Sequence, residues 1–245
     1  MAAKTEASGG KIFIGTSGWA YPTWKPEFYP QDVPQKKFLE HYATQLNSVE
    51  VNYTFRALPT AKMIADWLGV TDQGFRFSFK APQRITHIRR LKDCAEAVAA
   101  LSRSLAPVVA AARLGAVLFQ LPPNFKVDAT RLDAFLLDVR GSRLRAAFEF
   151  RHNSWFCDEV YEVLRRHGAA LCAAESDDLE SPDVVTAPFA CYRLRKSDYS
   201  AKEMDAIEKI LRLRAAGGEV FAYFKHEDEP TGALHAVEML QRLRR

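Results

Sequence analysis

Two glutamates and two arginines occupy positions in this sequence that suit acid–base chemistry. Glu50 and Glu149 each have apolar neighbours on both sides, and Arg193 and Arg195 alternate with apolar residues in the same way. Two carboxylates can share the roles of general acid and general base, while guanidinium groups stabilise negative charge. The pattern predicts acid–base chemistry on an anionic substrate.

The residues near Glu149 suggest which groups act as the base and which as the proton donor. Arg151 lies two positions from Glu149, so we expect it to lower the pKa of Glu149 and favour a base or charge stabiliser there. His152 and His87 follow segments that read as strands and are candidates for the proton donor. The candidate catalytic residues are therefore Glu50, Glu149, His152 and His87.

These side chains need a scaffold, and the chain supplies eight short apolar or alternating segments that read as strands. The segments are residues 11–15, 46–53, 75–80, 116–121, 145–151, 169–174, 189–195 and 220–226. Helical or irregular stretches separate them, which favours parallel strands joined by right-handed crossovers. Eight such units in 245 residues, without a Gly-x-Gly-x-x-Gly motif after the first, predict an α/β fold consisting of a single (β/α)8 TIM barrel.

Some segments depart from this regular plan. Residues 176–188 show no helical period, so we expect an irregular crossover after the sixth strand. Pro107 is expected to break or kink the helix between residues 93 and 113. Residues 1–10 are expected to form a disordered tail, and residues 11–245 the barrel domain.

Strand alternation predicts which side chains enter the barrel. If the bulky apolar residues pack beneath the helices, the polar residues of each strand point inward and meet at the carboxyl-terminal mouth, where barrel active sites form. The predicted mouth residues are Glu50, Asn52, Lys80, Gln120, Glu149, Arg151, Arg193, Arg195 and Lys225. A polar network that only fills the barrel remains the alternative.

The first predicted loop adds further binding candidates, namely Thr16, Ser17, Trp19 and Tyr21. Its aromatic rings could stack on a sugar or base, or could instead fix the loop to the barrel. Near the last helix, residues 229–232 resemble a barrel phosphate site, with plain helix capping by Thr231 as the alternative.

Composition limits the partners and the compartment. The chain has 34 Lys and Arg against 30 Asp and Glu, a net charge of +4, and 48% hydrophobic residues. This balance excludes a disordered chain and gives no basic excess typical of nucleic-acid binding. No apolar stretch approaches the roughly 20 residues of a membrane span. The four cysteines lack Cys-x-x-Cys spacing, and we expect a cytoplasmic protein without a membrane partner.

Several motifs, in order, resemble the YecE-like family, catalogued as domain of unknown function 72. They are Gly-Thr-Ser-Gly-Trp-Ala-Tyr at 15–21, Val-Glu-Val-Asn at 49–52, Gln-Leu-Pro-Pro-Asn-Phe at 120–125, and Glu-Phe-Arg-His at 149–152 followed by Ser154-Trp155. The resemblance implies a TIM barrel without an established activity and adds Trp155 to the binding candidates. The chain departs from the family pattern at Arg56 and at Lys225-His226-Glu227.

These patterns together predict a mouth that binds a phosphate-bearing anion, with nucleic acid as one candidate, and that acts as a hydrolase. A non-catalytic nucleic-acid or ligand-binding module and a glycoside hydrolase are the alternatives. No cofactor is expected. His87, His152 and His226 follow strand ends, but no His-Glu-x-x-His pair exists and the lysines and arginines would repel a cation. We therefore expect no metal.

Overall fold

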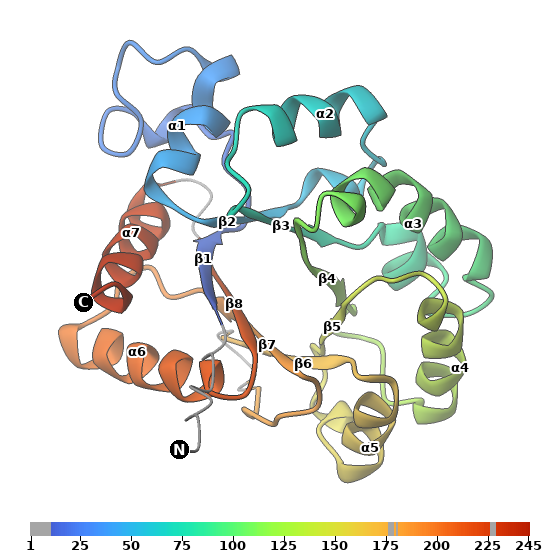
Figure 1. The fold of residues 1–245 in the computed structure, drawn as a ribbon. Coiled ribbons are helices and arrows are strands. Elements are labelled where there is room, and N and C mark those ends of the chain that lie inside the picture. The colour runs from blue at the N-terminus through green and yellow to red at the C-terminus, as the bar shows by residue number, and fades with distance from the viewer. Residues whose placement is uncertain (1–10, 176–178, 180, 226–228) are drawn as a thin grey trace, which may run out of the picture.

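Eight parallel strands form the centre of the structure, a computed structural model that describes residues 11–175, 179, 181–225 and 229–245 (Figure 1). The strands are β1 (Ile12–Thr16), β2 (Ser48–Val51), β3 (Arg76–Lys80), β4 (Leu114–Gln120), β5 (Ala146–Glu149), β6 (Ala170–Ala174), β7 (Phe189–Leu194) and β8 (Glu219–Phe224). Their order is β1-β8-β7-β6-β5-β4-β3-β2. A parallel bridge between Ser17 and Glu50 joins the two ends of this sheet. The predicted TIM barrel is confirmed.

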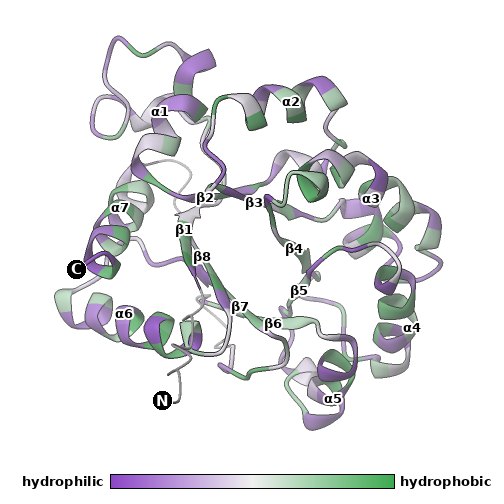
Figure 2. Ribbon diagram, in the orientation of Figure 1, coloured by the Kyte–Doolittle hydropathy of each residue, from purple (hydrophilic) through white to green (hydrophobic). Residues whose placement is uncertain are grey.

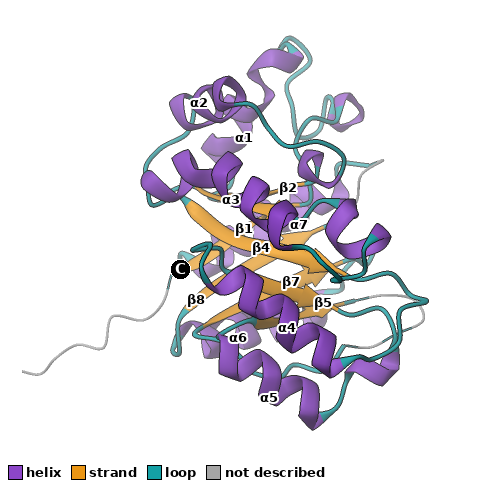
Figure 3. Ribbon diagram, turned by 90° about the vertical axis from the view of Figure 1, so that its right-hand side faces the viewer, coloured by secondary structure: helices purple, strands orange, loops and turns teal. Residues whose placement is uncertain are grey.

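Helices surround the strands, as the side view shows (Figure 3). They are α1 (Phe38–Gln45), α2 (Ala61–Gly69), α3 (Ala95–Ala110), α4 (Ala129–Arg140), α5 (Asp158–His167), α6 (Ala201–Ala215) and α7 (Thr231–Leu243). Side-chain caps hold several amino-terminal ends: Thr60 caps α2, Asp128 caps α4, and Ser200 forms a capping box on α6. Such caps satisfy backbone N–H groups that the first helical turn leaves unpaired.

The ring of helices is interrupted between α5 and α6 (Figure 1). No helix lies among the described residues between β6 and β7, in agreement with the irregular crossover expected there. Of the break or kink expected at Pro107, the break is wrong, because α3 continues through Pro107 to Ala110. Pro107 is exposed and close to the end of the helix, so its ring meets solvent and only the last turn remains beyond it.

The strands separate two apolar layers, as alternation predicts. Side chains such as Phe77, Phe119 and Phe148 pack outward beneath the helices, whereas Phe13 and Phe221 stack inside the barrel with ring centroids 5.1 Å apart. Both hydrophilic and hydrophobic residues lie on each helix, while β4 is almost entirely hydrophobic (Figure 2). A strand buried on both faces has this composition in parallel barrels.

A chain of hydroxyl groups crosses the barrel interior below the mouth. Tyr223 Oη donates to Ser78 Oγ at 2.6 Å and lies 2.8 Å from Ser48 Oγ. Ser78 Oγ also accepts from the Ala116 N–H at 2.8 Å. Burial raises the pKa of Tyr223 well above its ordinary value, so its hydroxyl stays neutral. This chain forms a hydrogen-bonded floor beneath the charged residues.

Candidate functional site

Arg193 lies at the centre of the mouth between the two glutamates. Its Nη2 is 2.8 Å from Glu50 Oε1, and its Nη1 is 2.6 Å from Glu149 Oε2. All three side chains are at most 2% exposed. The charge of the two carboxylates raises the pKa of Arg193 despite the opposing effect of burial. The arginine therefore stays ionised and holds both carboxylates in position.

Glu149, at the end of β5, has its hydrogen-bonding capacity largely filled. Besides Arg193, it accepts from Gln120 Nε2 at 2.8 Å and from Arg195 Nη2 at 3.0 Å. Burial by itself raises the pKa of Glu149, but Arg193 and Arg195 outweigh it and lower that pKa to about 2. Glu149 is therefore a fixed anion at neutral pH and does not serve as a proton donor.

Glu50, at β2, is less completely engaged. Its Oε1 accepts from Ser17 Oγ at 2.7 Å as well as from Arg193. Its Oε2 is buried and makes no hydrogen bond to any residue that the structure describes, and the same is true of Asn52 Oδ1. Buried polar oxygens normally have a partner. The mouth thus retains acceptor capacity on the β2 side.

Lys80, at the end of β3, is a half-buried cation in the same mouth. Its Nζ lies 4.4 Å from the centroid of the Phe55 ring. It forms no hydrogen bond or ion pair with the described residues. Burial lowers the pKa of Lys80, the charge of Arg193 lowers it further, and Glu50 and Glu149 oppose the change, which leaves it at about 8.

His87 and Arg151 extend the cationic side of the mouth. Burial, followed by the charges of Lys80, Arg151 and Arg90, lowers the pKa of His87. The ring is consequently neutral at pH 7, with Nδ1 2.9 Å from Thr86 Oγ1. Arg151 is partly exposed and has no hydrogen-bond or ion-pair partner within the described ranges. Its guanidinium donors are therefore open to a ligand.

The connection after β3 carries an unusual backbone. Residues Arg84–Ile88 form a short π-helix, and Arg90, Leu91 and Asp93 have φ angles of 48°, 67° and 50°. Non-glycine residues seldom adopt such angles, and they cluster where a functional geometry is held in place. Arg90 Nη2 donates to Asn124 Oδ1 at 3.1 Å. This loop fixes His87 and Arg90 at the mouth.

Three of the four candidates at the end of β1 and in the loop after it pack against the barrel. Thr16 Oγ1 donates to the Gly18 carbonyl at 2.6 Å and turns towards Tyr42, away from the mouth. Trp19 is half-buried, with its ring edge-on to Trp67 at 5.6 Å. Tyr21 Oη donates to the Ser17 carbonyl at 3.0 Å. These contacts fix the loop. Of the candidates there, only Ser17 joins the charged network, donating to Glu50 Oε1 at 2.7 Å and accepting from Arg193 Nη2 at 3.1 Å.

The two candidates that follow β5 also have structural roles. Trp155 is completely buried, stacks on Phe150 at 4.6 Å and donates from Nε1 to the Phe125 carbonyl at 2.6 Å. His152 Nδ1 accepts from the Ser154 N–H at 3.2 Å and caps the short 3-10 helix Asn153–Trp155. Trp155 has no surface left for a ligand.

The phosphate site expected near the last helix is only partly described. Lys225 follows β8 at the mouth, and its charge contributes to lowering the pKa of Lys80. Residues 226–228, including His226 and Glu227, lie outside the described residues. Thr231 does not cap α7, whose N-cap residue is Pro230. The alternative of plain helix capping by Thr231 is therefore wrong, because the helix begins at Thr231 itself.

Sequence reasoning missed the hydroxyl floor and the loop after β3. Alternation placed Ser48 and Ser78 inside the barrel, but nothing in the sequence linked them to Tyr223. Phe55, whose ring lies against the Lys80 amine, was not among the candidate residues. Within the described residues, no group of three or more His, Cys, Asp or Glu side chains is arranged to hold a metal ion.

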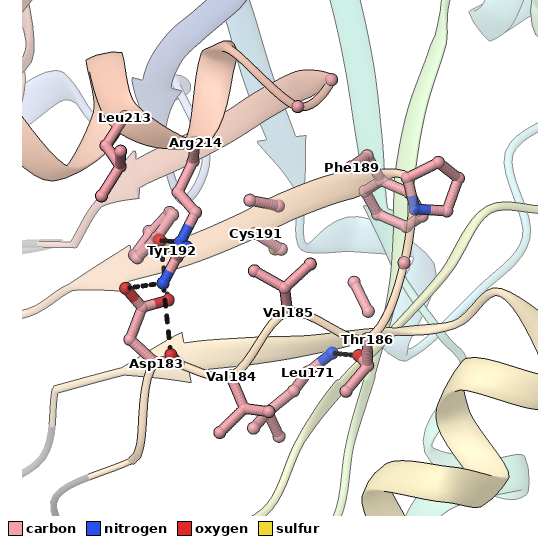
Figure 4. A pocket seen from close by; sticks show the side chains of 16 residues that line it. Leu171, Asp183, Val184, Val185, Thr186, Phe189, Cys191, Tyr192, Leu213 and Arg214 are labelled. Atoms are coloured by element: carbon pink, nitrogen blue, oxygen red, sulfur yellow. Dashed lines mark hydrogen bonds and ion pairs between the residues drawn. The ribbon is translucent and has the colours of Figure 1, made fainter.

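A separate hollow lies on the outer wall of the barrel, where the irregular crossover passes β7 and α6 (Figure 4). Arg214 bridges to Asp183 at 2.8 Å, and Tyr192 Oη donates to the same carboxylate at 2.8 Å. Thr186 Oγ1 accepts from the Leu171 N–H at 2.8 Å. These contacts tie the crossover to the barrel at a point where the described residues form no helix. The packing of the crossover against β7 and α6 therefore accounts for the hollow.

The fold and the mouth define a TIM barrel whose carboxyl-terminal face carries a buried arginine–glutamate network. The sequence profile described as "Protein of unknown function DUF72" matches residues 13–245. The chain belongs to this family. The expected resemblance is confirmed, and the family description assigns no activity. No helix in the described part of the chain is long and apolar enough to cross a membrane.

Relatives of this chain include two proteins with curated sequences. UPF0759 protein YecE of Escherichia coli is 31% identical over 156 residues, covering 63% of this chain and 54% of YecE. UPF0759 protein YunF of Bacillus subtilis is 31% identical over 157 residues, covering 62% of this chain and 54% of YunF. The matched part thus spans about half the length of these relatives.

Solved structures agree with the fold. A DUF72 family protein from Thermotoga maritima superposes with a TM-score of 0.85 at 25% identity, covering 96% of this chain and 100% of the other. A DUF72 family protein from Enterococcus faecalis has a TM-score of 0.75 at 20% identity, with 96% and 98% covered. The second comparison, at this identity, supports the barrel architecture alone.

Proposed function

We propose that the barrel mouth binds a phosphate-bearing anion. The observation that carries this proposal is the position of Arg193, which engages both glutamates at 2.8 and 2.6 Å. Arg193 and Arg195 together balance the charge of the two carboxylates. Arg151 and Lys80 then leave a surplus of positive charge around them. A site with a surplus of positive charge attracts anions.

Arg151 and Arg195 are the residues that contact the ligand in this proposal. Arg195 is already held by Glu149, which orients its guanidinium, and Arg151 is partly exposed beside it. Planar guanidinium groups recognise phosphate through paired N–H donors. The phosphate is carried by a small molecule or by a nucleic acid, and both present the same group to the mouth.

The binding test uses glycerol 3-phosphate as the probe and isothermal titration calorimetry as the measurement. We expect Arg151→Gln to weaken binding about 10-fold or more, because a hydrogen bond to a charged group contributes roughly 1.5–3 kcal/mol. Arg212→Gln, at an exposed pair on α6, is the matched control and leaves affinity unchanged. Glycerol without phosphate does not bind. Equal affinity of the wild type and Arg151→Gln would contradict the proposal.

Nucleic acid is tested in the same way with a short single-stranded oligonucleotide. If the mouth takes its phosphate from a nucleic acid, affinity falls steeply with added salt as counterions are released, and Arg151→Gln weakens it. Binding of glycerol 3-phosphate without oligonucleotide binding identifies a small molecule as the source of the phosphate.

In this proposal, Glu50 is the general base that activates water for hydrolysis at the mouth. Glu149 accepts hydrogen bonds from three residues and does not carry a proton, whereas Glu50 Oε2 has no partner among the described residues. A base must have a free oxygen within reach of the attacking water. Release of inorganic phosphate from a phosphate monoester, lost in Glu50→Gln, supports this role. If the phosphate monoester binds but no inorganic phosphate is released, the mouth is a binding site without hydrolytic activity. A glycoside hydrolase is not favoured, because it needs a protonated acid, and Arg193 and Arg195 keep Glu149 ionised.

A further inference from the structure

We propose that Lys80 forms an imine with the carbonyl group of a phosphate-bearing aldehyde or ketone bound at the mouth. This inference rests on the proposed anion site and adds a covalent step to it. It concerns the one residue of the mouth whose side chain carries a nucleophilic amine and makes no hydrogen bond or ion pair within the described residues.

The position of Lys80 suits such a step. The residue ends β3, so its backbone is held in the barrel while its side chain reaches the mouth. Its Nζ lies over the Phe55 ring at 4.4 Å, and Phe55 is itself packed edge-on against His87 at 5.1 Å. The amine is therefore placed by an apolar surface and is not tied to a carboxylate.

The surrounding charges keep the amine reactive. Burial and the neighbouring charges of Arg193 and Lys225 favour the neutral form, while Glu50 and Glu149 favour the ammonium form. The pKa of Lys80 is about 8 as a result. At pH 7.5 a substantial fraction of the amine is unprotonated, which an ordinary lysine with a pKa near 10.4 does not provide. Desolvation beside another cation is a known means of activating a lysine.

The chemistry is balanced without a further reactant. The lone pair of Nζ attacks the carbonyl carbon and gives a carbinolamine, which loses one molecule of water to form the C=N bond. Glu50 Oε2 is the carboxylate oxygen of the mouth that remains without a partner in the described residues. It takes the proton released by Nζ and returns it to the former carbonyl oxygen, which leaves as water. Arg151 and Arg195 hold the phosphate of the same substrate.

The test is trapping of the imine by borohydride, which reduces C=N to a stable secondary amine. Glyceraldehyde 3-phosphate is the probe, and peptide mass spectrometry locates the adduct. We expect modification of Lys80 at least 10-fold faster than modification of Lys62, an 83% exposed lysine in the same molecule. The rate at Lys80 reaches half its maximum near pH 8. Glyceraldehyde without phosphate modifies Lys80 more slowly.

Variants separate the chemistry from folding. Lys80→Arg keeps a cation over the Phe55 ring but cannot form an imine, so the adduct disappears from a protein whose melting temperature shows that it is folded. Lys62→Arg leaves the adduct at Lys80 unchanged. If glycerol 3-phosphate binds the wild type and Lys80 is modified no faster than Lys62, the imine is ruled out and the anion site stands. If glycerol 3-phosphate does not bind and Lys80 shows no preference, both proposals fail.

Discussion

Arg193 donates to Glu50 from one nitrogen at 2.8 Å and to Glu149 from another at 2.6 Å, so a single guanidinium separates two buried carboxylates. The three residues come from β7, β2 and the end of β5, and they meet only because the sheet closes into a barrel. Without Arg193, Glu50 would have no ion pair and Glu149 would keep only the one with Arg195.

Replacing that arginine is expected to destabilise the protein strongly. Arg193→Met leaves Glu50 buried without an ion pair and removes one of the two arginines that pair with Glu149. Breaking a buried ion pair in this way costs about 3–5 kcal/mol. Urea denaturation measures the change. Arg212→Met, at an exposed pair with Glu208, should change stability by less than about 1 kcal/mol. If Arg193→Met also lowers the free energy of unfolding by less than about 1 kcal/mol, the pairing contributes little to the stability of the fold.

The stability of the protein should decline in acid through Glu149. Its pKa is about 2 in the folded chain against an ordinary value of 4.5, so the ionised form stabilises the fold above about pH 5. That contribution is lost as pH falls from 5 towards 2, and it is on the order of 3 kcal/mol. Chemical denaturation at several pH values should show a smaller decline in Glu149→Gln than in the wild type. Glu40→Gln, at an exposed pair, serves as the control. Parallel pH curves for the wild type and Glu149→Gln would contradict the assignment.

The hydroxyl floor should be sensitive to loss of one oxygen. Tyr223→Phe removes the group between Ser48 and Ser78 and leaves two buried hydroxyls short of a partner. Such a loss costs about 1–3 kcal/mol. Tyr53→Phe, at a side chain 49% exposed, should have almost no effect. Thermal unfolding of both variants makes the comparison, and equal melting temperatures would argue against a structural role for the floor.

Trp155 should prove structural and not a ligand contact. Trp155→Ala opens a cavity against Phe150 and should cost about 3–5 kcal/mol. Trp155→Phe retains most of the packing, so glycerol 3-phosphate should bind with an affinity within about twofold of the wild type. A folded Trp155→Phe protein that no longer binds this probe would place the residue in the site after all.

The amino-acid sequence by itself determined the barrel and the inward direction of its polar side chains. Both follow from local rules: strand and helix alternate along the chain, and successive strand residues face opposite sides. The alternation of strand residues was thus sufficient to place Glu50, Glu149 and Arg193 inside the barrel. The irregular crossover after β6 was also visible, because residues 176–188 lack a helical repeat.

Only the tertiary structure decided which of these side chains meet. Glu50 and Arg193 are 143 residues apart in the chain, and their pairing depends on barrel closure and on the relative heights of β2 and β7. Closure likewise buried Trp155 beneath Phe125, turned Thr16 towards Tyr42, and placed Lys80 over Phe55. Contacts of this kind depend on residues distant in sequence, so no local spacing could predict them.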